Sequence, residues 1–463
     1  MLKIQPTRNL DNQTANQAKG GLQMARIHRR KLLKLSGAGA IAAKTGGIAA
    51  ILASGRAPAY AQGTTVHWLR WNDFVPNSDK VLREQIAPAA AKDLGITLNI
   101  EMINGNDIQA RTTAAIQSGS GPHVICALNN WPQLYADSVA PVDEIAEKLG
   151  KDQGGFYKES IAVANNGKKW LGVPWCILGN ENSYRKSWFE AVGFNKFPQT
   201  WDEYRDAGKK LKAKGQPLGQ ALGHSFGDPP TFVYPYLWSW GGKEVDKDGK
   251  VALNSKETVE SVKFWTAFWK DCCDEGGLAW DDSSNNRAFL AGTISSTLNG
   301  ASIYLLAKRD ADKYQTEKGT PLWQDILHGE LPKGPAGQFS YQLPMTNMLM
   351  GYSKQQKPAK DFLGWISSKP VYQAWFDSQG GYSAGPTTIW EQDPLWQKDP
   401  VMLPFQKAGR SGQFPGYAGP ADRKAGEVLS KYVIIDMYAK AVQGMPAEDA
   451  VKWATGELQK IYV

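Results

Sequence analysis

The sequence contains few cysteines, few histidines and no long apolar run. Its 463 residues include four cysteines and five histidines, and neither residue type recurs at a metal-site spacing. No stretch of 18 consecutive apolar residues occurs, so a membrane-spanning helix is not predicted. The H-E-x-x-H and phosphate-loop motifs are also absent. We therefore expect a globular protein of two or three cores that holds no cofactor.

The positive charge is confined to the N-terminus. The formal net charge is +8. Ten of the 53 basic residues but only one of the 45 acidic residues lie in residues 1–61, so the remainder carries a net charge of −1. A protein that binds polyanions would keep its basic excess in the folded part. The charge distribution therefore argues against nucleic acid as a partner.

Residues 1–61 have the features of an export signal. Arg29 and Arg30 precede a Gly/Ala-rich apolar run, and Ala59 and Ala61 form an A-x-A cleavage site. The segment resembles a twin-arginine signal, although His28 departs from its usual pattern. We expect cleavage near Ala61 and a periplasmic location. Translation could start at residue 1 or at residue 24, since both are methionine.

The N-terminal part of the exported chain alternates strands and helices. "TTVHWLRW", "ITLNIEMI" and "HVICAL" are predicted strands, and two helices connect them, which indicates a parallel α/β sheet. Ligands of such sheets meet the loops that follow the carboxyl ends of the strands. The candidate residues in these loops are Trp71, Asp73, Asn104, Asp107, Asn129 and Trp131. In any single loop, Asn and Asp could instead serve a turn or a helix cap.

The cysteines leave one question open. A disulfide is permitted in an exported protein, and Cys126 with Cys176 is one conceivable pair. The adjacent Cys272 and Cys273 lie in a predicted helix, and we expect them to be unpaired.

Several sequence blocks occur in an order that is informative. They are "GVPW" at 172–175, "YRKSWFEAVG" at 184–193, "PQTWDEY" at 198–204, "RAFLAGTISSTLNGASIY" at 287–304, "LPKGPAG" at 331–337 and "GGYSAGP" at 380–386. With these blocks the chain resembles the bacterial extracellular solute-binding proteins of ABC importers, of the sugar type typified by maltose-binding protein. "SGPHVI" departs from the pattern of the family at His123.

The resemblance implies an α/β, two-lobed periplasmic-binding-protein fold. Each lobe would be a mixed sheet flanked by helices, and the ligand cleft would lie at the hinge. We expect residues 62–175 plus 297–347 to form lobe 1 and residues 176–296 plus 348–463 to form lobe 2. The matching blocks add Trp175, Asn299 and Tyr382 to the candidate ligand-binding residues.

The segment "YPYLWSWGG" at 234–242 is rich in aromatic residues. The paired glycines at its end can terminate a helix. Aromatic rings cover the apolar faces of sugars, while Asp, Asn and backbone groups bond the hydroxyls. Trp238 and Trp240 are therefore candidates for a sugar platform, and an ordinary core position is the alternative.

The prediction is a receptor that performs no chemistry. It would capture a di- or oligosaccharide as a monomer and deliver it to the permease subunits of an ABC importer. A polyol, a glycerophosphate or a polyamine is the alternative solute. A secreted glycoside hydrolase is the enzyme alternative, with two carboxylates drawn from Asp73, Asp107, Glu181 and Asp228. "DKDGK" at 246–250 lacks the spacing of a calcium loop and predicts a hairpin turn.

Overall fold

The structure is a computed structural model that describes residues 63–463. The twin-arginine pair, the two candidate start residues and the expected cleavage near Ala61 lie outside the described residues. Within 63–463, no helix is both long enough and apolar enough to cross a membrane.

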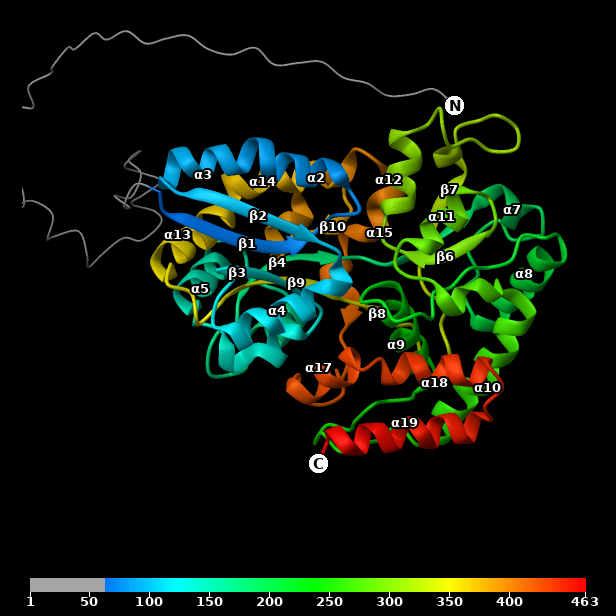
Figure 1. Cartoon of the computed structure of the whole chain (residues 1–463). Coiled ribbons are helices and arrows are strands. Elements are labelled where there is room, and N and C mark those ends of the chain that lie inside the picture. The colour runs from blue at the N-terminus through cyan, green and yellow to red at the C-terminus, as the bar shows by residue number, and fades with distance from the viewer. Residues whose placement is uncertain (1–62) are drawn as a thin grey trace, which may run out of the picture. The chain divides into compact units, whose positions relative to one another are not determined.

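A six-stranded mixed sheet organises one half of the described chain (Figure 1). Its strands, in the order in which they lie side by side, are β10 (Ser383–Ala384), β4 (Val173–Leu178), β9 (Leu343–Leu349), β3 (Val124–Leu128), β1 (Thr65–Trp71) and β2 (Thr97–Ile103). β1 runs parallel to β2 and β3, whereas β9 is antiparallel to β3 and β4. The three parallel strands predicted from the N-terminal sequence are therefore confirmed.

The sequence pattern of these strands follows their position in the sheet. β3 is central and every residue of it is buried, as is typical of a strand covered on both faces. β2 lies at an edge, and Leu98 and Ile100 are buried while Thr97 and Asn99, which alternate with them, are exposed. The helices of this half are α2 (Pro76–Val81), α3 (Ala87–Leu94), α4 (Ile108–Ser118), α5 (Asp143–Asp152), α6 (Lys158–Ala164), α13 (Gln356–Ile366) and α14 (Lys369–Ser378). We call this sheet with these helices the first lobe.

A three-stranded antiparallel sheet organises the other half, so only the sheet of the first lobe is mixed. Its strands are β6 (Ser296–Asn299), β5 (Glu181–Arg185) and β7 (Ile326–Gly329), with β5 in the middle. The accompanying helices are α7 (Lys186–Glu190), α8 (Trp201–Ala213), α9 (Asp228–Trp240), α10 (Lys256–Cys272), α11 (Ser284–Leu290), α12 (Ser302–Arg309), α18 (Val433–Val442) and α19 (Ala447–Ile461). We call this sheet with these helices the second lobe.

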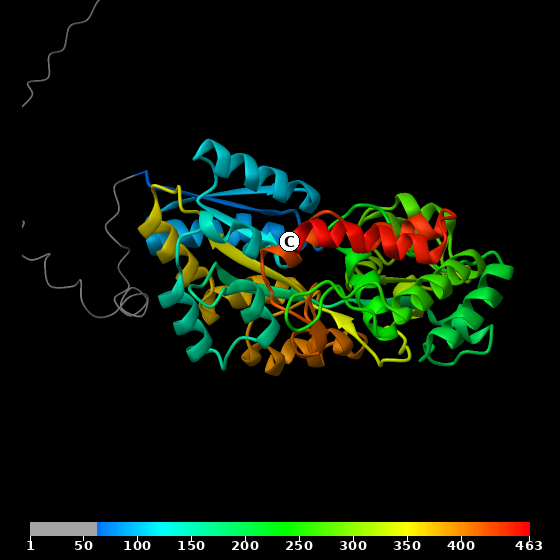
Figure 2. The ribbon, with the colours of Figure 1, turned by 90° about the horizontal axis from the view of Figure 1, so that it is seen from below.

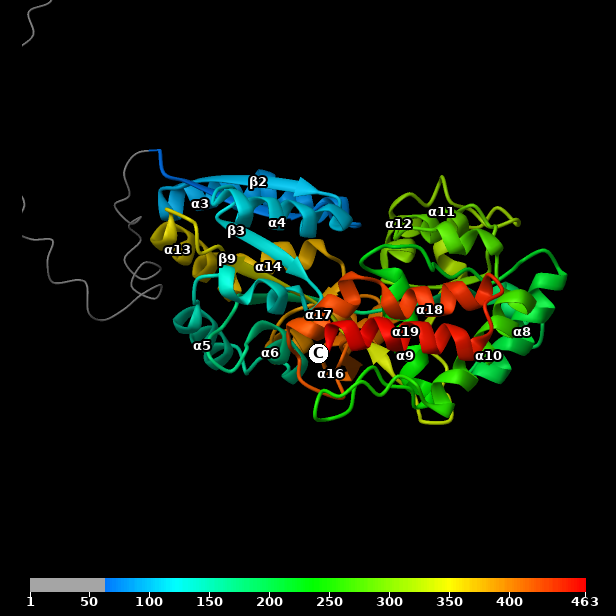
Figure 3. The ribbon, with the colours of Figure 1, turned by 60° about the horizontal axis from the view of Figure 1, so that its bottom comes forward.

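The chain crosses between the lobes three times. The first crossing joins β4 to β5, and the second joins β7 to β9 and contains β8 (Ser340–Tyr341). The third follows β10 and contains α15 (Leu403–Gln406), α16 (Ala408–Ser411), β11 (Gly412–Gln413) and α17 (Arg423–Ser430). β8 and β11 pair in parallel, which ties two crossings together. Figures 2 and 3 show the two lobes at opposite ends of this connection.

The strand pairing does not follow the lobe boundaries expected from the sequence. In the segment 297–347, assigned to lobe 1, β6 and β7 pair with β5, and only β9 joins the six-stranded sheet. In the segment 348–463, assigned to lobe 2, β10 pairs with β4, and α13 packs on β1 and β9. α13 does so because its apolar side chains, Phe362 and Trp365 among them, are buried there. We propose that residues 63–178 and 343–384 form the first lobe.

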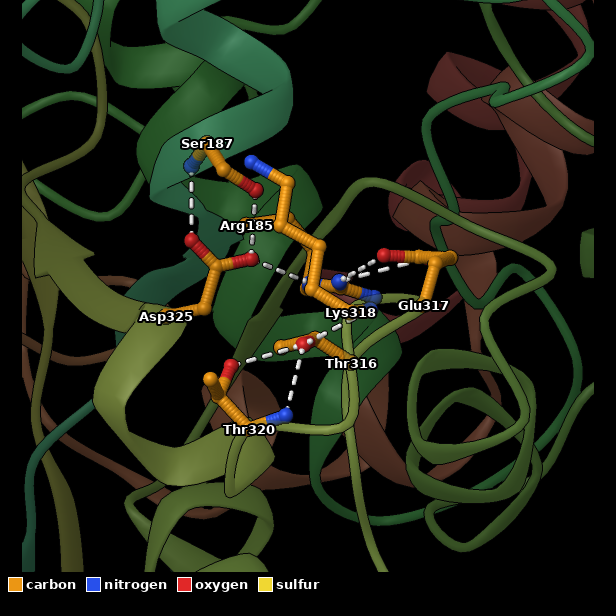
Figure 4. A network of polar contacts seen from close by, with 7 residues as sticks. All are labelled: Arg185, Ser187, Thr316, Glu317, Lys318, Thr320 and Asp325. Carbon is orange, nitrogen blue, oxygen red and sulfur yellow. Dashed lines mark hydrogen bonds and ion pairs between the residues drawn. The ribbon is translucent and has the colours of Figure 1, made fainter.

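A buried arginine anchors a long loop of the second lobe (Figure 4). The Arg185 guanidinium bonds the Asp325 carboxylate at 2.8 Å and the Glu317 carboxylate at 3.0 Å. Asp325 also accepts the backbone N–H of Ser187 at the start of α7. The Arg185 guanidinium lies 4.2 Å from the ring centre of Trp188. The network pairs the buried charge of Arg185 and fixes the loop before β7 against β5.

Candidate ligand-binding cleft

Two adjoining hollows lie between the lobes, and together we call them the cleft. The first is lined by Trp71, Phe74, Leu178, Asn180, Phe226, Gly227, Asp228, Asp282, Asn299, Gly300, Ser302, Leu343 and Tyr382. The second is lined by Trp71, Asn72, Phe74, Asn104, Gly105, Asn106, Phe226, Asp281, Asp282 and Ser283. Four residues belong to both linings, so the hollows form one continuous site.

Aromatic rings from both lobes meet in the cleft. Trp71 is the last residue of β1, which places it at the carboxyl end of a parallel strand. Its ring lies nearly parallel to that of Tyr382, with 6.4 Å between the ring centres. Phe226 of the second lobe meets Trp71 edge to face at 5.6 Å. The Nε1–H of Trp71 has no hydrogen-bond partner among the described residues.

Two buried aspartates of the second lobe line the first hollow. Oδ1 of Asp282 accepts the Ser225 hydroxyl at 2.7 Å, the Gly227 N–H at 3.2 Å and the Asp228 N–H at 2.7 Å. Oδ2 of Asp282 and Oδ2 of Asp228 are buried and have no partner among the described residues. Each carboxyl therefore has one oxygen that no described residue bonds.

Burial sets the charge state of this pair. Burial raises the pKa of Asp282 to about 6, although the Ser225 hydroxyl and the two backbone amides on Oδ1 act in the opposite direction. Burial also raises the pKa of Asp228 well above its usual value, and the neighbouring Asp282 adds to that rise. Among residues 63–463, no positively charged group acts on the pair to favour its ionised form.

Amide and hydroxyl groups form the rest of the polar wall. Asn299 ends β6, its Oδ1 accepts the Ser302 hydroxyl at 2.8 Å, and its Nδ2 donates to Oδ1 of Asn286. The Asn286 amide also donates to the Ser302 hydroxyl at 3.0 Å. This network fixes the orientation of Asn299 and Ser302 in the wall of the first hollow.

Direct hydrogen bonds join the lobes across the cleft. The Phe226 N–H donates to Oδ1 of Asn106 at 3.0 Å, and the Asn129 side-chain amide donates to the Phe226 carbonyl at 3.1 Å. Asn129 adopts a left-handed backbone conformation, with φ of 54°, which asparagine tolerates better than most residues. The Tyr341 hydroxyl from the second crossing donates to Oδ1 of Asn129 at 2.7 Å. The backbone of Phe226 thus connects the two lobes.

Some of the residues predicted from the sequence come together in the cleft. Trp71, Asn299 and Tyr382 line the first hollow, and Asn104 joins Trp71 in the second. Asn129 and Trp131 line neither hollow, but both contact Phe226, Asn129 by its hydrogen bond and Trp131 by its ring. The loops after β1, β2 and β3 therefore approach one site from the first lobe.

Other predicted residues lie elsewhere. Asp73 is buried in the first lobe, where it accepts the Ser78 hydroxyl and the Gln379 amide. Asp107 precedes α4, is exposed, lines neither hollow and makes no side-chain cap bond to that helix. Trp175 lies in the core of the first lobe, with its ring 4.6 Å from that of Trp375. The geometry gives none of these three a contact with the cleft.

The aromatic segment 234–242 forms the second half of α9 and its C-terminus. Gly241, with φ of 95°, terminates the helix as expected. Trp238 is 1% exposed, donates from Nε1 to the Glu244 carboxylate at 3.0 Å and stacks on Tyr341. Trp240 packs on Phe264 with 5.2 Å between ring centres. The segment has the geometry of core, and neither tryptophan lines the cleft.

Phe74, Phe226 and Asp282 line the cleft but were not among the candidate ligand residues. Asp228, which also lines it, was considered only as a hydrolase carboxylate. Phe226 and Asp228 belong to "FGDPP", where two prolines follow an aspartate, a sequence suited to the start of a helix. That local signal predicts the start of α9 but not its approach to the first lobe.

The remaining cysteine, turn and metal predictions concern regions outside the cleft. All four cysteines are buried and free. "DKDGK" forms the predicted turn, since Val245 and Val251 pair and Oδ1 of Asp246 accepts two backbone N–H groups. In the part of the chain that the structure describes, no three His, Cys, Asp or Glu residues are placed to hold a metal ion.

Comparison with known sequences gives one family. Residues 84–404 match the family of bacterial extracellular solute-binding proteins. A Brucella abortus protein described as a binding protein is 22% identical over 301 residues, covering 63% of this chain and 69% of that protein. A Deinococcus radiodurans protein described as an ABC transporter-binding protein is 23% identical over 215 residues, covering 44% of this chain and 49% of that protein.

Solved structures share the fold. The maltose-bound MalE3 protein of T. maritima superposes with a TM-score of 0.72 at 19% identity, covering 86% of this chain and all of that one. A solute-binding protein of an ABC transporter from Agrobacterium radiobacter K84, in complex with ribitol, superposes with a TM-score of 0.71 at 19% identity, covering 86% of this chain and 99% of that one. These similarities establish the two-lobed periplasmic-binding-protein fold, as the sequence predicts.

Proposed function

Since this chain belongs to the bacterial extracellular solute-binding protein family, we propose that it captures a di- or oligosaccharide and delivers it to the permease of an ABC importer. The cleft between the lobes is the binding site in this proposal. The ligand would contact both lobes at once, so its binding would favour the closed arrangement.

The chemistry of the cleft is the observation that carries the proposal. The nearly parallel rings of Trp71 and Tyr382 offer an apolar surface for the C–H face of a sugar ring. Oδ2 of Asp228 and Oδ2 of Asp282 can accept hydrogen bonds from sugar hydroxyls, and the Nε1–H of Trp71 can donate a hydrogen bond to one. Buried polar atoms gain most from a ligand that bonds each of them. A polyhydroxylated solute meets all of these requirements.

A thermal-shift screen tests the proposal. The protein, purified after export, is heated with a panel of mono-, di- and oligosaccharides, and hits are measured by calorimetric titration. A ligand at one hundred times its Kd stabilises the folded state by about 2.7 kcal/mol. At least one sugar should raise the Tm and bind with one-to-one stoichiometry. Failure of every sugar in the panel would contradict the carbohydrate assignment.

The residue types that line the cleft discriminate among the alternative solutes, which are polyols, glycerophosphates and polyamines. Neither hollow is lined by Lys, Arg or His. A phosphate group needs cationic side chains or several converging N–H donors, so a glycerophosphate fits this lining poorly. Polyols and polyamines remain compatible with it.

A binding role also fits the carboxylates better than glycoside hydrolysis does. Asp228 and Asp282 belong to the same wall, because the Asp228 N–H bonds Oδ1 of Asp282. Hydrolysis requires two carboxyl groups that flank the scissile bond. Of the other hydrolase candidates, Asp73, Asp107 and Glu181 line neither hollow. We therefore propose that the protein performs no chemistry.

The cellular setting follows from the leader sequence. We propose that residues 1–61 direct export by the twin-arginine route and are cleaved near Ala61, which would release a monomer into the periplasm. The two lobes of the closed receptor would then contact the two permease subunits at the inner membrane.

A further inference from the structure

The cleft is acidic and has no basic residue in its lining. Asp228 and Asp282 line the first hollow, and Asp281 and Asp282 line the second. Asp281 is half exposed and lies 3.7 Å from the Arg287 guanidinium. Among the described residues, Asp228 and Asp282 have no such ion-pair partner. Two carboxyl groups are thus buried side by side, in a body whose net charge is close to zero.

Hydrogen bonds and the start of α9 hold both aspartates in this position. Asp282 is 6% exposed, and the three donors on Oδ1 fix its carboxyl plane. Asp228 is 7% exposed and belongs to the first turn of α9, where the helix dipole favours a negative charge. Their Oδ2 atoms are the unpartnered ones. Burying a carboxylate costs much free energy unless a positive group pairs with it.

The aromatic side chains around the carboxyls suit a cation as well. Trp71, Phe226 and Tyr382 line the same hollow as Asp228 and Asp282. The face of an aromatic ring, that of Trp above all, attracts an ammonium group. The lining also contains the polar residues Asn180, Asn299 and Ser302, whose side chains can bond hydroxyl groups. The cleft thus joins a site for hydroxyls with a site for a positive charge.

We propose that the natural ligand is a carbohydrate that carries a protonated amine, an amino sugar or a close polyhydroxylated relative, and that its ammonium group binds between Asp228 and Asp282. The inference rests on the proposed sugar-receptor function and narrows its substrate class. A neutral sugar could donate hydrogen bonds to the two Oδ2 atoms, but it would leave the negative charge of the carboxylates buried without a positive partner. An ammonium group supplies both the donors and the opposite charge. Burial raises the pKa of both carboxyls, and an adjacent ammonium group would act in the opposite direction.

Matched sugars test the proposal. Each sugar of a panel is measured in three forms, neutral, 2-amino and N-acetylated, with glucose, glucosamine and N-acetylglucosamine as one such set and deacetylated chitobiose against cellobiose as another. Binding is measured by calorimetric titration at pH 7.5, with spermidine as an amine without hydroxyls. At least one amino sugar should bind ten or more times as tightly as both its neutral and its N-acetylated counterpart.

Two variants and one control locate the effect. Asp228→Asn and Asp282→Asn should each lower the affinity for the amino sugar to about that of its neutral counterpart. In Asp282→Asn, the new Oδ1 can still accept all three hydrogen bonds, so the fold should persist, which circular dichroism checks. Asp248→Asn removes an equal charge at an exposed site paired with Lys247 and should leave binding unchanged.

The outcomes separate the inference from the function on which it rests. If neutral sugars bind as well as amino sugars or better, the inference is overturned and the sugar receptor stands. If spermidine binds in an Asp282-dependent manner and no sugar binds, the amine site stands and the carbohydrate assignment falls. If no compound of either kind binds, both are overturned.

Discussion

The side-chain amide of Asn129 in the first lobe donates a hydrogen bond of 3.1 Å to the backbone carbonyl of Phe226 in the second lobe. The bond joins the turn after β3 to the loop before α9, which are almost one hundred residues apart in sequence. Since the Phe226 N–H also bonds Asn106, this one peptide segment is held by two loops of the opposite lobe. Closure of the cleft therefore depends on contacts that neither lobe forms alone.

Loss of this contact should weaken closure. Asn129→Gly removes this hydrogen bond together with the acceptor of the Tyr341 hydroxyl, and glycine tolerates the left-handed backbone at this position. A typical net hydrogen bond contributes about 1 kcal/mol, so we expect ligand affinity to fall roughly fivefold. Calorimetric titration with a ligand found in the screen measures the loss. Asn166→Gly, in an exposed turn of the first lobe, should have no such effect, and an equal loss in both variants would contradict the closure mechanism.

The charge on Asp282 should destabilise the ligand-free protein near neutral pH. The folded-state pKa of about 6 lies above the ordinary value of 3.8, so the folded state binds the proton more tightly than the unfolded state does. Stability is therefore highest below the unfolded pKa and declines as the pH rises from about 4 to 6. Asp282→Asn should remove the part of this decline that Asp282 causes and raise stability at pH 7 by roughly 2–3 kcal/mol, whereas Asp228, whose pKa is also raised, keeps its own part. Denaturant unfolding between pH 4 and 8 measures the free energy of unfolding of both proteins. An unchanged pH profile in the variant would contradict the raised pKa of Asp282.

The cysteines should be unreactive in the folded protein. Burial raises the pKa of Cys126 to about 12 and that of Cys176 well above its usual value, so neither forms the reactive thiolate. We expect a thiol reagent such as DTNB to find no accessible thiol in the native state and four thiols after unfolding without reductant. Two thiols after unfolding would instead indicate a disulfide, with Cys126 and Cys176 as the pair that the sequence suggests.

The export route can be tested on the leader. Replacing Arg29 and Arg30 by lysine keeps the charge but removes the paired arginines that define a twin-arginine signal. The precursor should then accumulate in the cytoplasm, as cell fractionation and immunoblotting would show. Normal export of this variant would exclude the twin-arginine route and leave a general secretory route.

The sequence predicts the half of the cleft that depends on local pattern. Apolar alternation locates β1 and β2, and because parallel strands end at the same edge of a sheet, Trp71 and Asn104 could be assigned to one site before the structure was known. Phe226 and Asp282 could not be assigned, because they reach the cleft only through the pairing of one lobe with the other. The strand pairing departs from the expected lobe boundaries for a similar reason. Whether β6 joins one sheet or the other depends on where the chain crosses back to the first lobe. The local hydrophobic pattern carries no information about the position of that crossing.

Trp71 and Trp238 should behave in opposite ways although both are almost fully buried, at 2% and 1% exposure. Burial alone does not separate a ligand platform from core. Trp71 lines the cleft, and its Nε1–H has no hydrogen-bond partner among the described residues. The Nε1–H of Trp238 instead donates to Glu244, and its ring stacks on Tyr341. Trp238→Ala should therefore lower the free energy of unfolding by roughly 3–5 kcal/mol and leave the affinity of the folded molecules unchanged.

Trp71→Ala should instead weaken ligand binding more than tenfold. An aromatic contact contributes about 0.5–1.5 kcal/mol beyond its buried area, and the area itself adds to the loss. Intrinsic fluorescence supplies a second readout, because the tryptophan emission that responds to ligand in the wild type should no longer respond in Trp71→Phe and should still respond in Trp238→Phe. If Trp238 substitutions abolish binding in protein that remains folded, the aromatic segment at 234–242 is the sugar platform after all, and the cleft assigned to Trp71 and Tyr382 is the wrong site.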